Sequence, residues 1–542
     1  MQLHIQSTIF GQLVRLASGN KTLRYPDEVD PSLWKKAVQQ DRSRQDSNGA
    51  SDESEKTTQD GGAADQELPI TTDNGGSDAL VVGWYGPDDP ENPQNWPNGL
   101  KHLVAFQMCL LNFAVYIASS IYVPGEPYLV EEFGVSPIVA VLGLSLFTLG
   151  YGFGPMLWSP LSELPRLGRT GIFFWTLLAF ILFQLPVGLA PNVAVFLVFR
   201  WVTGFCGSPC LATGGGTIND IYPPHKVPYF LCLWSAAGIM GPVFGPIIGG
   251  YLAPVMGWRW TIWVFTFLCC LVLVTMFFLF PETSATNILY NRAKRLRKAT
   301  GNDRLKSQTE VDSAHYSPKD NLLLLARAFT LTFTEPIILL VDTYAALLYG
   351  VLFIWFESFP IVFGEMYGFS SGEQGLVFFG ILVFTLIALP GYLLWIKKSL
   401  VPSMMSGKFK PEMVLPPSFV GGIALPVCLF WFGWTSREDV HWIVPVIGSG
   451  MFAIGVVTLF NSAYMYIGIA YAQYSASVFA GATLFRASLG AAFPLFARSL
   501  FTRLGVGPGN SLLGGLAILF IPIPFIFYRF GERIRQWSNR AM

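Results

Sequence analysis

The sequence predicts an all-α membrane protein in which twelve transmembrane helices form two six-helix bundles. Three observations support this fold class. First, 52% of the 542 residues are hydrophobic and 13% are charged, whereas soluble proteins are about 25% charged. Second, twelve apolar runs are each long enough to cross a hydrocarbon layer, which takes about 20 helical residues. Third, a hydrophilic segment divides these runs six and six, and a short motif recurs in both halves.

Residues 1–100 are polar and are predicted to form a cytoplasmic, largely disordered tail. The segment 39–74 is rich in Ser, Asp, Gln, Gly and Glu and has almost nothing to bury, which is typical of disorder. Residues 7–16 are mildly amphipathic, and both a surface helix and a frayed terminus fit this pattern. The first residues lack a basic region followed by an apolar core, so we expect no cleavable signal peptide.

The apolar runs begin after Lys101, and their length favours helices because backbone groups in lipid need internal partners. Their approximate extents are 103–123, 138–158, 171–190, 193–216, 229–253, 260–280, 336–362, 373–396, 416–434, 442–468, 475–498 and 509–529. The predicted organisation is an N-terminal bundle over 101–280, a cytoplasmic central loop over 281–335, a C-terminal bundle over 336–530 and a cytoplasmic C-terminal tail over 531–542.

A short motif follows the first helix of each half. The pattern E-x-[FY]-G-[VF]-S occurs at residues 131–136 and again at 365–370. Its recurrence at equivalent places indicates a duplicated six-helix unit. That is the architecture expected of a transporter whose site lies between its halves.

Basic residues concentrate in alternate loops and therefore predict the orientation in the membrane. The loops on one side contain most of them, including Arg292 and Arg295 in the central loop, Lys397, and Arg533 near the C-terminus. Both termini are accordingly predicted to face the cytoplasm.

Several function classes are not indicated. Lys plus Arg and Asp plus Glu both number 35, so net charge gives no sign of a nucleic-acid partner. The five histidines do not cluster, and the seven cysteines lie in apolar runs without a C-x-x-C pattern, so neither a metal site nor a disulfide framework is expected. No G-x-x-x-x-G-K-[ST] loop occurs, so ATP is not the expected energy source. We expect a protein that is not an enzyme and needs no cofactor.

The fifth apolar run contains glycines at intervals of three and four residues, interleaved with two prolines. In a helix these glycines form one flat face that lets a neighbouring helix approach closely, while the prolines remove backbone donors and kink the segment. A tight packing seam and a mobile element both fit this pattern. The residues are Gly238, Gly241, Pro242, Gly245, Pro246, Gly249 and Gly250.

Charged residues inside apolar runs are costly in lipid and are therefore candidates for function. Arg200, in the fourth run, is either tied to backbone carbonyls or is a fixed charge that acts on a nearby carboxylate. Arg486 is the analogous charge in the second half, with the same two interpretations. Glu357 lies between aromatic residues in the seventh run and is either a proton carrier or an interface carboxylate. Asp342 lies nearer the cytoplasmic end of the same run.

Uncharged polar and aromatic residues in the runs are candidates to line a cavity for varied aromatic ligands. The polar ones alternatively bridge helices, for a gain near roughly 0.6 kcal/mol each. The candidates are Gln107, Asn112, Tyr116, Tyr349, Phe356, Asn461 and Tyr464.

The loop between the second and third runs resembles the loop signature of the major facilitator superfamily, in the variant that fungal drug:proton antiporters carry. Its residues are Ser159, Pro160, Leu161, Ser162, Glu163, Gly168 and Arg169. By this resemblance Glu163 takes the place of the signature's acidic residue and becomes a proton-coupling candidate. A serine replaces the first glycine, and the spacing to Gly168 is longer than in the signature.

Further stretches resemble the same family. Arg200 with Gly204 is similar to the fourth-helix signature, and residues 238–250 are similar to the fifth-helix antiporter motif. Residues 92–97 and 281–283 also match the fungal group. The likeness runs from about residue 80 to 530, and the chain is most similar to fungal multidrug and fluconazole-resistance efflux transporters.

The resemblance implies a twelve-span major facilitator fold and a multi-pass protein of the plasma membrane. It implies outward export of azoles and other amphipathic compounds, driven by the proton gradient without ATP or a cofactor. The expected partners are small amphipathic drugs or metabolites, protons and the lipid bilayer. One alternative is an exporter dedicated to a single metabolite, such as a toxin or a polyamine. Another is a non-transporting receptor that signals through the N-terminal tail.

Overall fold

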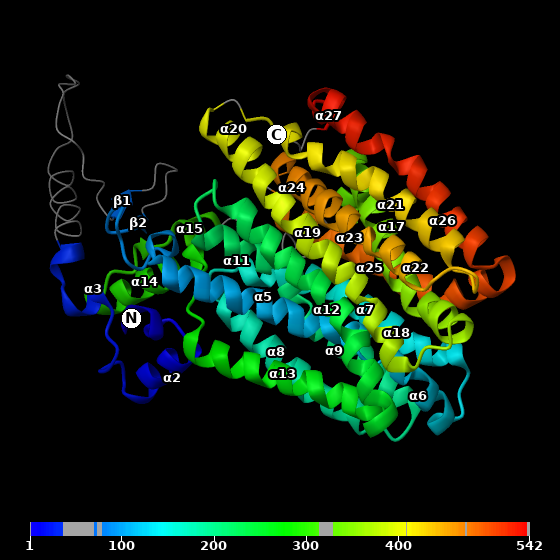
Figure 1. Cartoon of the computed structure of the whole chain (residues 1–542). Helices are drawn as coiled ribbons and strands as arrows, with labels where there is room; N and C mark the ends of the chain where they lie inside the picture. Colours follow the sequence, from blue (N-terminus) through cyan, green and yellow to red (C-terminus); the bar gives the residue numbers. More distant parts are fainter. Residues whose placement is uncertain are drawn as a thin grey trace, which may run out of the picture.

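The computed structural model describes residues 2–35, 70–72, 79–313, 329–407, 409–471 and 474–538. In this part of the chain eleven helices are long and apolar enough to cross a membrane, and the shorter apolar helix α9 (Val193–Gly207) takes the fourth place. Figure 1 shows these helices side by side in one bundle. The predicted all-α membrane fold is confirmed.

The N-terminal half, residues 98–279, contains the first six spans. They are α5 (Asn98–Ser120), α7 (Pro137–Glu163), α8 (Gly168–Gly188), α9 with its continuations α10 (Pro209–Ala212) and α11 (Gly214–Ile221), α12 (Val227–Met256) and α13 (Trp258–Leu279). Two short elements, η2 (Val123–Gly125) and α6 (Glu126–Phe133), follow α5.

The fourth predicted run is one apolar segment in the sequence but three helices in the structure. Pro209 has no amide hydrogen and cannot donate to the carbonyl of Phe205 one turn earlier. That carbonyl instead accepts hydrogen bonds from the Ser208 hydroxyl, at 2.8 Å, and from the Trp158 indole, at 3.0 Å. The break therefore leaves no backbone acceptor unpaired at this point.

The C-terminal half, residues 336–535, contains the remaining spans. Its elements are α17 (Pro336–Phe359), η3 (Pro360–Met366), α18 (Ser371–Val377), α19 (Phe379–Trp395), η4 (Ile396–Leu400), α20 (Val401–Met405), η5 (Pro411–Val414), α21 (Pro416–Thr435), α22 (Ile443–Gly450), α23 (Phe452–Gly455), η6 (Val456–Phe460), α24 (Asn461–Ala470), α25 (Ser475–Leu504), α26 (Val506–Phe520) and α27 (Pro522–Arg535). The repeated motif has the same local conformation in both halves, since Gly134 and Gly368 have φ of +62° and +70°. Ser136 and Ser370 then occupy the N-cap positions of the following helices, and the Ser370 hydroxyl accepts a hydrogen bond from the amide of Glu373.

The two halves contact each other along α7 and α25 and, near one end, where α12 meets α18. The Ser145 hydroxyl donates to the carbonyl of Ala491 at 2.7 Å across this interface. Figure 1 shows α6 and α18 at one end of the bundle and α2 and α14 at the other. We name these the far end and the tail end.

Helix α12 uses its glycines to contact both halves. A Cβ on Gly245 would lie 2.8 Å from the amide nitrogen of Ile121, and one on Gly249 would lie 2.0 Å from the Ile121 carbonyl oxygen, so this glycine face packs directly on the backbone of α5. Pro246 leaves the carbonyl of Pro242 without its usual helical donor, and the hydroxyl of Ser120 donates to it at 3.1 Å. Gly250 faces the other half.

The N-terminal tail contains more structure than its composition predicts. Its described part includes α1 (Gln2–Gln6), α2 (Ile9–Ala17), α3 (Pro26–Val29), η1 (Pro93–Asn95) and a sheet in which β2 (Leu80–Val82) pairs with β1 (Ile70–Thr72) and with β3 (Leu305–Lys306). Of these elements, α3 and the sheet pack against α14 (Ala285–Thr300) of the central loop, which also contacts α15 (Gln308–Ser313). Helix α2 packs against α13, and η1 packs against α11. We name this assembly the tail layer. Most of the predicted disordered segment 39–74 lies outside the described residues.

Ion pairs between the acidic tail and the basic helix α14 hold the tail layer together. Arg292 lies 2.7 Å from Asp89, and Arg295 lies 2.9 Å from Asp27. Burial raises the pKa of Asp89, but the hydrogen bond and the charge of Arg292, together with hydrogen bonds from two backbone amides, outweigh burial and lower it. The basic residues that indicate orientation in the sequence thus also bind the tail.

Candidate functional site

Midway along the bundle, two hydrogen bonds join the halves through tyrosine hydroxyls. Arg486 of α25 donates from Nη2 to the hydroxyl of Tyr116 on α5, at 3.1 Å. Tyr151 of α7 donates to the hydroxyl of Tyr349 on α17, at 2.7 Å. Because both bonds cross the interface, any separation of the halves at this level must break them.

The guanidinium of Arg486 is surrounded by aromatic rings. Its Cζ lies 5.2 Å from the ring centre of Phe460, 5.4 Å from Tyr349 and 5.7 Å from Tyr464. Each such contact is worth about 0.5–2 kcal/mol. Arg486 forms no ion pair with another described residue, and its Nε has no hydrogen-bond partner there. The central positive charge is therefore stabilised by π-electrons and hydroxyls.

A cavity of about 60 Å³ adjoins Arg486 between the halves. The residues that line it are Asn112, Tyr116, Leu211, Trp234, Ser235, Gly238, Ile239, Pro242, Ala345, Leu348, Tyr349, Leu352, Phe452, Val456, Phe460 and Arg486. No acidic side chain is among these described residues. The indole nitrogen of Trp234 and the Oδ1 of Asn112 are buried without a partner in the described part of the chain. The hydroxyl of Ser235 is also buried without a partner there, so the cavity offers hydrogen-bond donors, acceptors and aromatic surface.

The volume indicates a closed state. Sites for drug-sized molecules measure roughly 300–1,000 Å³, which is several times the volume of this central cavity. A ligand of that size can enter only after the halves move apart.

The predicted cavity residues divide into two groups. Asn112, Tyr116 and Tyr349 line the central cavity, and the ring of Tyr464 lies against Arg486. The other three lie elsewhere. Gln107 donates to the carbonyl of Thr275, and Asn461 donates to the carbonyl of Val457, four residues earlier in the chain. Phe356 lines a second cavity.

The second cavity lies at the far end and has a volume of about 580 Å³. Glu126 of α6 and Glu357 of α17 line it from opposite halves and interact electrostatically. Each has one carboxylate oxygen that is buried without a partner among the described residues. At the mouth, the exposed pair Arg498 and Glu365 lies 3.4 Å apart. Glu126 was not among the residues predicted from the sequence, because its flanking prolines are typical of a loop.

Asp342 is a third unpaired carboxylate. Its residue is 0% exposed, and neither carboxylate oxygen has a partner in the described chain. Asp342 lies on α17 on the tail-end side of Tyr349 and interacts electrostatically with Arg486. At 100° per residue, Asp342, Tyr349 and Glu357 fall within about 80° on one face of α17. One helix thus carries a carboxylate on either side of the central tyrosine.

Arg200 is fully buried among rings and one backbone carbonyl. Its Nη1 donates to the carbonyl of Ala118 at 2.9 Å, and its Cζ lies 4.3 Å from the ring of Tyr122 and 5.0 Å from that of Phe147. No ion pair joins it to another described residue, and Nε and Nη2 have no partners there. Tyr122 also lies beside Glu126. The structural interpretation of Arg200 is supported, and the tyrosine connects it to the second cavity.

The loop that resembles the family signature is organised around Glu282 at the tail end. The backbone amides of Arg169 and Thr170 donate to its carboxylate at 3.0 and 3.2 Å. Burial raises the pKa of Glu282 although these amides favour its charged form. A Cβ on Gly168, whose φ is +69°, would lie 2.5 Å from the same carboxylate.

The acidic partners in this loop differ from the expected one. Arg169 forms an ion pair with Asp220 at 2.5 Å, whereas Glu163 is exposed at the end of α7. Asp220 and Glu282, rather than Glu163, are therefore the acidic residues that bind Arg169 and the adjacent backbone.

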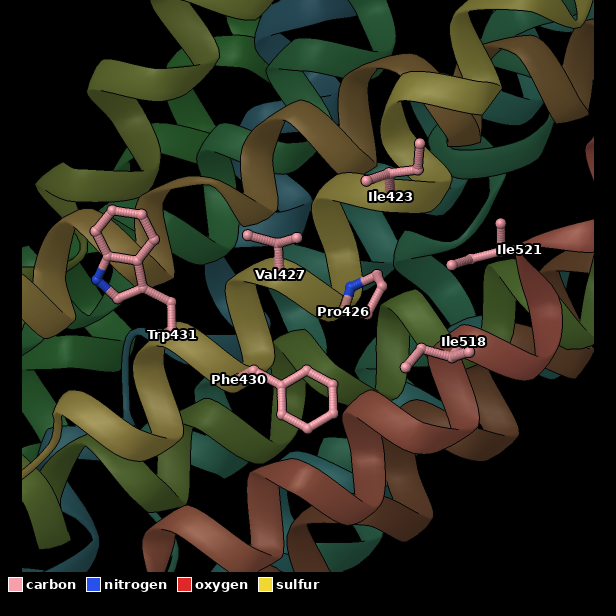
Figure 2. A pocket seen from close by; sticks show the side chains of 7 residues that line it. All are labelled: Ile423, Pro426, Val427, Phe430, Trp431, Ile518 and Ile521. Atoms are coloured by element: carbon pink, nitrogen blue, oxygen red, sulfur yellow. The ribbon is translucent and has the colours of Figure 1, made fainter.

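Figure 2 shows a third cavity, of about 630 Å³, on the outer surface of α21 and α26. Ile423, Pro426, Val427, Phe430, Trp431, Ile518 and Ile521 line it. These described lining residues are all aliphatic or aromatic. We interpret it as a groove for lipid chains.

The chain matches a known family and several known proteins. The family model described as "Major Facilitator Superfamily" matches residues 108–494. "Transporter mfs1" of Schizosaccharomyces pombe is 40% identical over 548 residues, with 99% of each chain covered. "Fluconazole resistance protein 1" of Saccharomyces cerevisiae is 41% identical over 469 residues, with 85% of each covered. The crystal structure of the human organic anion transporter MFSD10 (TETRAN) aligns with a TM-score of 0.55 at 16% identity, over 79% of this chain and 100% of that one.

Proposed function

This chain belongs to the major facilitator superfamily, and we propose that it exports azoles and other amphipathic drugs in exchange for protons. Its close similarity to fungal drug-resistance transporters supports this. The observation that carries the proposal is the central cavity, which lies between the halves and is bounded by hydrogen bonds that cross them. A site in that position is exposed to alternate sides when two bundles rock against each other. The bundles we propose as moving units are residues 101–280 and 336–530.

The chemistry of the central cavity supports neutral or anionic aromatic substrates. A cationic ligand would meet the charge of Arg486 without a carboxylate in the cavity lining to offset it. A neutral azole has ring nitrogens that accept hydrogen bonds, and the unpaired donors of Trp234 and Arg486 can supply them. Its rings can stack on Phe460 and Tyr349. The same argument disfavours a polyamine as the substrate.

The carboxylates on α17 support proton coupling. Asp342 lies toward the tail end and Glu357 toward the far end, and both have unpaired oxygens. We propose that Glu357, together with Glu126, takes up protons from outside and that Asp342 releases them inside. One charge crossing 100 mV is worth about 2.3 kcal/mol, and a tenfold concentration ratio costs about 1.4 kcal/mol. One proton per drug molecule is therefore enough for a more than tenfold gradient.

We place the protein in the plasma membrane with its tail end in the cytoplasm. The basic residues of α14 and the C-terminal segment lie on that side, as the positive-inside rule requires. Drug then enters from the tail end and leaves at the far end.

The test is export from a yeast strain that lacks its own drug pumps. Cells that express the chain should keep less fluconazole than cells with an empty vector, and the difference should vanish when the proton gradient is collapsed. Spermidine retention should not change. Export of spermidine but not fluconazole would refute the substrate assignment. Fluconazole export that persists without a proton gradient would refute the coupling.

A matched pair of substitutions tests the site itself. Trp234→Phe removes one donor from the central cavity and keeps an aromatic ring. A net hydrogen bond is worth about 0.5–1.5 kcal/mol, so azole export should fall by up to about tenfold at low drug concentration. Trp431→Phe, in the outer groove of Figure 2, is the control and should export normally. Equal effects in both variants would contradict the assignment.

A further inference from the structure

Helix α2 has an apolar face that the rest of the described protein covers only in part. Phe10, Leu13, Val14 and Ala17 recur at the spacing of one helical face, and Leu13 is 51% exposed. Leu16, beside this face, is 73% exposed. This short helix thus leaves two large apolar side chains, Leu13 and Leu16, exposed.

The rotation of α2 about its axis is fixed by contacts on its opposite side. Arg15 is 7% exposed and forms an ion pair with Glu28 at 2.7 Å. Gly11 lies so close to the first helix that a Cβ there would be 1.8 Å from the carbonyl oxygen of Ile5. The apolar face therefore cannot turn inward without breaking both contacts.

The exposed face of α2 continues the lipid-facing surface of α13. Phe267, Leu271, Val274 and Phe278 recur along one face of α13 and are all exposed, at 45–60%. At the tail end of this stripe the ring of Phe10 lies 5.1 Å from that of Phe278 and 5.9 Å from that of Phe277. Figure 1 shows α2 beside this end of α13.

We propose that α2 is an interfacial anchor whose apolar face lies in the bilayer leaflet on the tail side, next to α13. The contact is apolar, because the one charged side chain of the helix, Arg15, is buried and paired. Helices of this kind lie at the boundary between headgroups and acyl chains. By the orientation proposed above, this leaflet is the cytosolic one. The inference otherwise does not depend on what the protein transports.

The anchor ties the tail layer to the membrane. Arg15 pairs with Glu28, and its Cζ lies 4.6 Å from the ring of Tyr25, which also packs against Arg295 of α14 at 3.7 Å. A displacement of α2 from the lipid is thus transmitted through these contacts to the central loop.

The test measures the depth of single side chains in the full-length protein in phosphatidylcholine nanodiscs. Nitroxide labels are placed by Leu13→Cys and, as a matched control, by Gln12→Cys on the neighbouring exposed position. The signal of the parent chain, treated in the same way, is subtracted because that chain contains seven cysteines. We expect the label at 13 to collide mainly with oxygen, which partitions into lipid, and the label at 12 to collide mainly with a water-soluble nickel complex.

Several outcomes would overturn the proposal. One is that the labels at 12 and 13 are equally accessible to the nickel complex. Another is that the label at 13 becomes accessible to oxygen only when anionic lipid is present. A third is that the label at 13 becomes buried only after a second protein is added. A second measurement does not need a label. Leu13→Glu should speed protease cleavage of the tail in nanodiscs several-fold, whereas Leu13→Met should leave it unchanged. Equal cleavage rates in both variants would also contradict an anchor.

Discussion

The contact between α12 and α18 allows a sharp test of how the halves move. A Cβ on Gly250 would lie 2.4 Å from the carbonyl oxygen of Ser371 and 3.2 Å from the Cα of Gly372. These are backbone atoms, so no side-chain rotation relieves the overlap. Restoring ordinary contact, which begins at 3.4 Å, requires the Cβ and that oxygen to separate by a further 1.0 Å. We expect Gly250→Ala to push the halves apart at the far end.

The magnitude follows from the cost of overpacking, about 1–3 kcal/mol. If that cost falls on the closed far end alone, the ratio of closed to open forms drops by about 5–150-fold. The assay is a distance distribution between spin labels on α6 and α18, measured in nanodiscs. A longer distance should become populated in Gly250→Ala, and drug export should slow.

Gly245→Ala is the matched control, because it introduces the same methyl group on the same helix. Its Cβ would meet the backbone of α5, which belongs to the same half. It should lower the melting temperature without changing the distance across the far end. An unchanged distribution in Gly250→Ala, or the same shift in both variants, would refute the reasoning.

Three further predictions concern charged groups. Glu126→Gln removes one of the two facing carboxylates, and we expect drug binding to persist while export loses its dependence on an imposed proton gradient in vesicles; normal coupling would exclude Glu126. Arg200→Ala empties a fully buried site at a cost of about 2–5 kcal/mol, so the yield of folded protein should decline. Arg200→Lys keeps a cation among the rings and should give a higher yield than Arg200→Ala. Equal yields of folded protein from both variants would contradict a structural role of the cation. Burial alone would raise the pKa of Glu28, but hydrogen bonds from Arg15 and the Tyr25 amide lower it. The stabilisation that Glu28 gives to the tail layer is therefore present above about pH 4.5 and is lost as the pH falls through the folded-state pKa. Protease cleavage after α2 should rise in acid, and Arg15→Gln should weaken this pH dependence.

Much of this architecture could be predicted from the sequence because it depends on local patterns. Run length predicts the spans, and glycine spacing predicts a close helix contact along α12. The identity of the partner could not be predicted, since nothing near Gly245 specifies α5 and nothing near Gly250 specifies Ser371. These pairings depend on contacts between residues more than 100 positions apart.

The candidate site shows the same division. Charge inside an apolar run was enough to find Arg486 and Glu357. It did not predict how their surroundings differ. Arg486 lies among aromatic rings, whereas Glu357 faces Glu126 across the interface between the halves. Tyr151 was missed, since one tyrosine among 20 carries no signal until Tyr349 is placed opposite it.

The ion pairs of the tail layer have a consequence for biosynthesis. Asp27 leaves the ribosome 268 residues before its partner Arg295. At about 5–20 residues per second, it waits roughly 10–50 s, during which six spans must enter the membrane. The layer can close only when the whole N-terminal half has been made. A nascent chain that stalls or inserts wrongly before α14 therefore keeps its acidic tail open, where quality-control proteases can reach it.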